Sequence, residues 1–87
     1  MTNEEIVSLT NQVFVESFEI APERLQPQAH IFTDFGLDSL DVVDLVVALQ
    51  QKFGVKIRSD ERVRGIRTLQ DIYGFIASIQ NEGGGAG

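Results

Sequence analysis

The stretch from Gly36 to Gly54 constrains the fold most, because it reads as one helix between two glycines. Asp38 and Ser39 both favour the N-cap position, where a side-chain oxygen accepts an unpaired N–H of the first turn. No Gly or Pro interrupts the chain from Ser39 to Gly54, so a helix of about four turns is expected. One apolar stripe has the spacing of a core-facing side: Val42, Leu45, Val46, Leu49 and Phe53.

The same helix carries a second apolar stripe flanked by acids: Leu40, Val43 and Val47, with Asp41 and Asp44. A small domain can bury only part of one helix, so we expect this stripe to face solvent. It begins beside Ser39, and a serine hydroxyl in that setting suits recognition by another protein. The alternative is that Ser39 only caps the helix and that the second stripe belongs to the core.

Two further helices flank this one. Thr2 and Glu5 form a capping-box pattern, which predicts a first helix that ends near Phe18. Its inward face is expected to hold Ile6, Leu9, Val13 and Phe14. Thr68 suits the cap of a last helix with these inward residues: Leu69, Ile72, Tyr73 and Ile76.

The segments between the helices are also informative. The connection from Pro22 to Asp38 is too apolar for a solvated linker, so we expect it to pack over the helices, with a short turn near its start. Its apolar residues are Leu25, Ile31, Phe32 and Phe35. Ser59 suits the cap of a short third helix, which we expect to end before Gly65. The expected fold is an all-α four-helix bundle of residues 1–80, in which the third helix is short and the other three are longer. We expect a flexible Gly-rich tail at 81–87.

Composition narrows the function classes. The 87 residues suffice for one domain, and a net charge of −6 disfavours binding to nucleic acid. The chain has no cysteine, so any thiol chemistry requires a thiol from outside the polypeptide. There is no apolar run that could span a membrane and no signal peptide, so we expect a cytoplasmic protein without membrane insertion. We also expect a monomer.

Catalysis and metal binding are disfavoured. A nucleophilic Ser39 needs a base, and the single histidine, His30, lies in the long connection without a nucleophile-elbow pattern around the serine. The clustered acids lack the spacing of a calcium loop: Asp34, Asp38, Asp41 and Asp44. We interpret them as a negative edge that attracts basic partners.

The motif from Gly36 to Asp41, Gly-Leu-Asp-Ser-Leu-Asp, leads into a Val/Leu-rich helix and resembles the attachment motif of acyl carrier proteins. Other segments fit the family pattern: residues 23–25 with 29–35, residues 53–57, and Thr68-Leu69. The resemblance covers the chain from about Ile6 to Ile79.

This resemblance implies a carrier without enzymatic activity. In the family, the serine of Asp-Ser-Leu receives 4′-phosphopantetheine from coenzyme A, and the thiol of that arm holds acyl groups as thioesters in fatty-acid, lipid or polyketide-type synthesis. Ser39 is then the attachment residue, and Asp38 helps to present it to a phosphopantetheinyl transferase. Other partners would be enzymes such as a ketoacyl synthase or an acyltransferase, which would contact Leu40, Asp41, Val43, Asp44 and Val47.

The chain departs from typical fatty-acid carriers in residues 58–67, where the family is strongly acidic. This segment holds two acids and four arginines: Arg58, Arg62, Arg64 and Arg67. The plain interpretation is a solvated basic face, and the sharper hypothesis is a second recognition patch of a specialised carrier. Two other functions stay open: a carrier of aminoacyl or peptidyl groups, D-alanyl included, and a helical interaction domain with Ser39 unmodified.

Overall fold

Helix α1 (Asn3–Phe18) begins at the predicted capping box. The Thr2 hydroxyl accepts the Glu5 N–H at 3.2 Å, and the Glu5 carboxylate accepts the Thr2 N–H at 3.3 Å. The helix ends where predicted, and Glu19 follows it in a left-handed conformation with φ of 56°. Leu9, expected to be buried, is half-buried. The buried residues of α1 are Ile6, Thr10, Val13 and Phe14.

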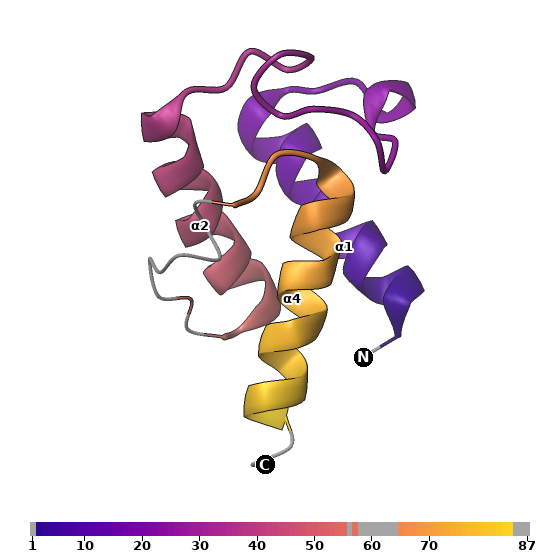
Figure 1. Cartoon of the computed structure of the whole chain (residues 1–87), viewed down its shortest axis with the longest axis vertical. Helices are drawn as coiled ribbons and strands as arrows, with labels where there is room; N and C mark the ends of the chain where they lie inside the picture. The colour runs from indigo at the N-terminus through magenta and orange to yellow at the C-terminus, as the bar shows by residue number, and fades with distance from the viewer. Residues whose placement is uncertain (1, 56, 58–64, 85–87) are drawn as a thin grey trace.

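In this computed structural model, α1 is followed by the 3-10 turn η1 (Pro22–Arg24) and the helices α2 (Ser39–Phe53) and α4 (Leu69–Gly84). The structure describes residues 2–55, 57 and 65–84, the last four by backbone alone. Helix α1 packs against both α2 and α4, and the connection after α1 arches over one end of the helices (Figure 1). The described chain is all-helical. The expected short third helix lies outside the described residues.

The C-terminal boundary of α4 differs from the prediction. The helix continues to Gly84, although the glycine-rich tail was expected to begin at residue 81. Helix elongation adds one backbone hydrogen bond per residue, and each glycine costs only about 1 kcal/mol relative to alanine, so the two glycines at 83 and 84 do not exclude a helical backbone. The placement of the tail at 81–87 was therefore wrong for residues 81–84.

The long connection contributes to the core, as predicted. Ile31 is fully buried, and Ile20 and Leu37 near its two ends are buried as well. Leu25, Phe32 and Phe35 pack against this core from the half-buried layer. The helices supply most of the other buried side chains: Ile6, Val13, Phe14, Leu45, Val46, Leu49, Leu69, Ile72, Phe75 and Ile76.

Backbone hydrogen bonds tie this connection to the start of α4. The Ile31 N–H donates to the Arg67 carbonyl at 2.9 Å, and the Leu69 N–H donates to the Ala29 carbonyl at 3.1 Å. His30 and Thr68 form an isolated antiparallel bridge between these two bonds. The pairing satisfies backbone groups that would otherwise be costly to bury. Two segments far apart in sequence are thereby held together.

Side chains join α1 to both neighbouring helices. The Tyr73 hydroxyl donates to Asn11 Oδ1 at 2.6 Å and so links α4 to α1. Burial raises the pKa of Tyr73 above its usual value of 10, with a smaller opposing effect from the Asn11 hydrogen bond. Lys52 of α2 lies 3.2 Å from Glu16 of α1, a surface ion pair that contributes little to stability.

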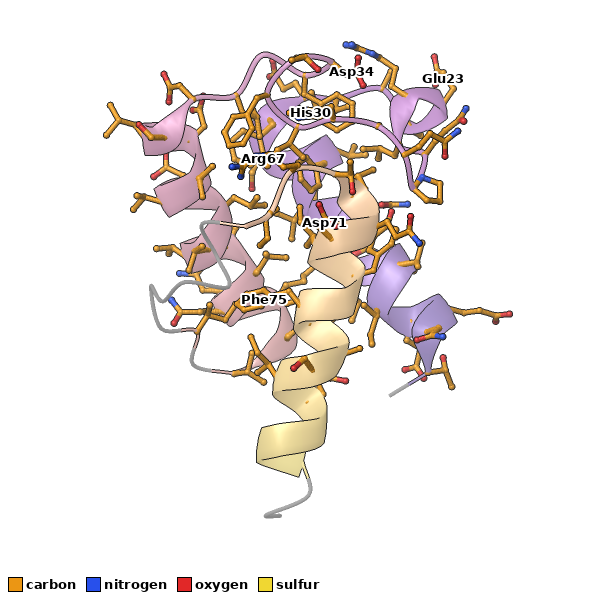
Figure 2. The ribbon with its side chains drawn as sticks, in the orientation of Figure 1. Glu23, His30, Asp34, Arg67, Asp71 and Phe75 are labelled. Carbon is orange, nitrogen blue, oxygen red and sulfur yellow. The ribbon has the colours of Figure 1, made fainter. Side chains whose placement is uncertain are left out.

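A second capping box starts α4. Thr68 caps the helix as predicted, its hydroxyl accepting the Asp71 N–H at 3.2 Å. The Asp71 carboxylate accepts the N–H groups of Arg67 at 3.0 Å and Thr68 at 3.1 Å. Burial acts to raise the pKa of Asp71, but the hydrogen bonds from Thr68 and Arg67 together outweigh it and lower this pKa below its ordinary value. Figure 2 shows Asp71 in the first turn of α4.

The Thr10 hydroxyl gives a first test of this core. It is fully buried on α1, and its oxygen has no hydrogen-bond partner among the described residues. A buried hydroxyl without a partner costs about 1–3 kcal/mol, so Thr10→Val should raise the free energy of unfolding by about 1 kcal/mol. Urea denaturation would measure this. Thr10→Ser, which keeps the hydroxyl and loses a methyl group, is the control and should destabilise. A Val variant no more stable than the wild type would contradict the expectation.

Asp71 gives a second test, through pH. Asp71→Ala removes the carboxylate from the cap and should lower the free energy of unfolding at pH 7 by about 1 kcal/mol, the usual size of a lost cap. Because the folded-state pKa is depressed, this contribution is present above the unfolded-state pKa and is lost as pH falls through the folded-state value. The difference between wild type and variant in urea denaturation should therefore shrink on going from pH 7 to about pH 3. Asp44→Ala, at an exposed acid of α2, serves as control; a pH-independent difference for Asp71 would argue against its role.

Candidate functional site

The first turn of α2 shows that Ser39 is not the capping residue. Asp38 is the N-cap: its carboxylate accepts the Asp41 N–H at 3.0 Å, and the Asp41 carboxylate accepts the Asp38 N–H at 3.1 Å. Ser39 is the first residue of the helix and is exposed. The alternative that Ser39 serves only as a cap is therefore wrong. Capping is done by its neighbour, and the serine hydroxyl is left at the surface.

The residues just before this turn fix where Ser39 lies. Gly36 has φ of 73°, a left-handed conformation that favours glycine, and its N–H donates to the Phe32 carbonyl at 3.0 Å. The next N–H, of Leu37, donates to the Ile31 carbonyl at 3.1 Å, and the Leu37 side chain is buried. Ser39 thus lies two residues after Leu37, which is held by its backbone bond and its buried side chain.

The two apolar stripes of α2 face opposite environments, as predicted. Leu45, Val46 and Leu49 are buried, and Val42 and Phe53 pack half-buried against the core. The second stripe is exposed: 75% for Leu40, 58% for Val43 and 45% for Val47. Large apolar side chains gathered on one exposed helix face commonly mark a surface that contacts another molecule. This stripe starts directly beside Ser39.

The four clustered acids differ in their contacts. Asp38 and Asp41 hold each other's backbone N–H groups, and Asp34 accepts the His30 N–H at 2.7 Å. Asp44 is exposed on α2. Within the described residues, no three His, Cys, Asp or Glu side chains are placed to hold a metal ion together. The acids therefore structure the loop and the helix start and leave a negative edge around Ser39.

His30 is occupied by backbone groups. Its Nδ1 lies 3.2 Å from the N–H nitrogen of Phe32 and 3.2 Å from that of Thr33. Sequence patterns do not indicate this role, because a lone histidine in a loop carries no periodic signal. Through these bonds His30 stabilises the loop that leads to Ser39, with Nδ1 as the acceptor of two backbone N–H groups.

Of the four arginines in residues 58–67, the structure describes Arg67. Arg58, Arg62 and Arg64 lie outside the described residues. Arg67 is exposed; its N–H donates to Asp71, and its Nη1 donates to the Ile66 carbonyl at 3.0 Å. Figure 2 shows Arg67 just before α4. In the part of the chain that is described, no helix has the length and apolar character needed to cross a membrane.

Comparison with known proteins agrees with these features. The sequence model of the family described as "Phosphopantetheine attachment site" matches residues 11–76. Acyl carrier protein 2 of Ralstonia nicotianae is 39% identical over 79 residues, which cover 91% of this chain and 96% of the relative. The acyl carrier protein of Thermosynechococcus vestitus is 36% identical over 76 residues, covering 87% and 93%.

Members of this family are carriers and not catalysts, and the group they carry is covalently attached 4′-phosphopantetheine. They are modified by a phosphopantetheinyl transferase and interact with enzymes of synthesis. Because both the family match and the two relatives span most of the sequence, the chain belongs to the acyl carrier protein family, and its function is to carry acyl groups on a phosphopantetheine arm.

Proposed function

We propose that Ser39 is the residue that receives the 4′-phosphopantetheine arm. It is exposed at the first residue of α2, and the capping bond that a serine in this place could make is made by Asp38 instead. A phosphate on its hydroxyl would lie at the positive end of the α2 dipole, where backbone N–H groups favour an anion. The serine also lies within the matched residues 11–76. These features fit a phosphodiester at this hydroxyl.

The modification forms one bond and breaks one. The Ser39 Oγ attacks the phosphorus of coenzyme A that bears the pantetheine, forming an Oγ–P bond. The P–O–P bridge of coenzyme A breaks, and adenosine 3′,5′-bisphosphate leaves. The hydroxyl proton passes to a base of the transferase. When bound, the arm supplies the thiol for thioesters, which the cysteine-free chain itself lacks.

Asp38 contributes by fixing the start of α2. Its reciprocal bonds with Asp41, at 3.0 and 3.1 Å, hold the first helical turn in one conformation. Ser39, between these two residues, is therefore presented in a defined direction. We assign Asp38 a role in presenting the serine to the transferase through this geometry.

The exposed stripe of α2 is the proposed contact surface for partner enzymes. Leu40, Val43 and Val47 offer apolar area beside the serine, and Asp41 and Asp44 offer negative charge to lysine or arginine around it. Rim ion pairs steer association and contribute little to affinity each. Weak polar contacts around a small apolar patch suit a carrier that must leave one enzyme for the next.

The finer identity of cargo and partners belongs to the same proposal. We infer acyl cargo of fatty-acid, lipid or polyketide-type synthesis, and partners such as a ketoacyl synthase or an acyltransferase. An aminoacyl or D-alanyl carrier is the alternative. The short third helix, the recognition patch of Arg58, Arg62, Arg64 and Arg67, the monomeric state and the cytoplasmic location stay predictions.

Intact mass tests the attachment residue. The apo protein, incubated with coenzyme A and a broad-specificity phosphopantetheinyl transferase, should gain the mass of one phosphopantetheinyl group. Ser39→Ala should gain none, while the conservative Thr10→Ser variant, altered only in the core, should be modified like the wild type. A gain in Ser39→Ala would place the arm elsewhere. No gain on the folded wild type would count against the carrier function itself.

Steady-state kinetics test the contact surface. Leu40→Ser removes the most exposed apolar side chain of the stripe and should lower kcat/KM of the transferase by about tenfold, since burying a leucine contributes about 1.5–3 kcal/mol and 1.4 kcal/mol is tenfold. Val15→Ser is the matched control, because Val15 is 37% exposed but lies on α1. Equal effects of the two substitutions would show that the stripe has no special role.

A further inference from the structure

We propose that His30 is a positioning residue for the modification of Ser39. Its neutral imidazole caps the turn that leads to the serine, and protonation of the ring releases that turn. This inference rests on the proposed function of Ser39 and adds to it a residue outside the attachment motif. It also makes loading of the carrier depend on pH through the carrier itself.

The hydrogen bonds at one ring nitrogen fix the protonation state of His30. Nδ1 lies 3.2 Å from the backbone nitrogens of both Phe32 and Thr33, and each of these is a donor. A nitrogen that accepts must carry a lone pair, so the ring hydrogen lies on Nε2 and the ring is neutral. An imidazolium has N–H groups at both positions and cannot accept. Protonated His30 therefore cannot form either bond.

These bonds have the geometry of a helix cap. The side chain at position 30 accepts from the residues two and three positions later, as an N-cap does. The Asp34 N–H donates to the His30 carbonyl at 2.9 Å, and the His30 N–H donates to the Asp34 carboxylate at 2.7 Å. His30 thus begins a single closed turn, and Figure 2 shows His30 and Asp34 in the connection above the helices.

The turn is held from outside as well. Arg24 of η1 donates through Nη2 to the Asp34 carbonyl, and its guanidinium lies 5.5 Å from the centre of the Phe35 ring. The Phe35 ring in turn lies 5.7 Å from that of Phe14 in the core. The capped turn is therefore connected to α1 on one side and, through the His30–Thr68 bridge, to the start of α4 on the other.

Few residues separate this turn from the serine. Gly36 closes it by donating to the Phe32 carbonyl, and Leu37 donates to the Ile31 carbonyl. Asp38 and Ser39 come next. The two amides that His30 binds lie in the segment whose carbonyls hold Gly36 and Leu37, so loss of the cap loosens the part of the chain that positions Ser39.

Other charged groups lie on the segments that contact this turn. They are Asp34 in the turn, Glu23 and Arg24 on η1, and Arg67 and Asp71 at the start of α4. These groups lie close to the same turn. A useful control therefore retains all of them and changes only the titrating ring. Asparagine meets this need, because its Oδ1 accepts as an N-cap and does not titrate.

The experiment compares the apo wild type with His30→Asn at each pH. The rate of phosphopantetheine transfer is measured by mass from pH 8 to 5.5 and expressed as wild type over His30→Asn, which cancels the pH dependence of the transferase. We expect a ratio near one at pH 8 that falls at least about threefold by pH 5.5, since an imidazolium has no lone pair with which to accept the two amides. His30→Ala has no side-chain acceptor for the two amides, so phosphopantetheine transfer to it should be slow at both pH 8 and pH 5.5. A flat ratio overturns the proposal.

A second measurement reads the cap without the transferase. In ¹H–¹⁵N NMR spectra, the amides of Phe32 and Thr33 should shift together with the His30 ring signals as pH falls, and should not do so in His30→Asn. Ring titration without any change at these amides overturns the cap. If Ser39 accepts no arm at any pH, the positioning role falls with the proposed function, while the amide titration still reports whether the cap exists.

Discussion

The pairing between the long connection and the start of α4 is the contact on which the rest of the structure depends. Ile31 is fully buried, its N–H is held by the Arg67 carbonyl, and the Ala29 carbonyl accepts from Leu69 one residue past Thr68. Without this pairing, the connection would be an apolar segment with unsatisfied backbone groups. With it, the start of α4 and the segment before α2 form one unit. The position of Ser39 then follows from contacts far from it in sequence.

The parts that the sequence predicted are those governed by local chemistry. The Thr2–Glu5 and Thr68 caps, the end of α1 and the bounds of α2 depend on residues within one turn of each other. The outward stripe was also predictable, because a helix with two apolar faces cannot bury both in a domain of this size. The choice between Asp38 and Ser39 as N-cap was not, since both residues suit that position and only the reciprocal bond with Asp41 decides it.

What could not be predicted depends on non-local contacts. No periodicity shows that residues 29–31 pair with residues 67–69. Phe75, in contrast, follows Ile72 by three residues, and this helical spacing is typical of the core side on which it lies. His30 is a further example: a single loop histidine has no meaning until the amides of Phe32 and Thr33 are seen at its Nδ1. The end of α4 was misplaced because composition predicts a tail, whereas helix elongation depends on the residues already ordered.

The aspartate pair at the start of α2 has a consequence for the speed and cost of docking. Each carboxylate accepts a backbone N–H, and this bond restricts the rotamers open to each side chain before a partner arrives. In the proposed docking, a basic group that approaches the serine would meet carboxylates already held by the cap, so less ordering of these side chains would remain for binding. Under the proposed function, a substitution of Asp41 would therefore alter both the start of α2 and the contact with partners.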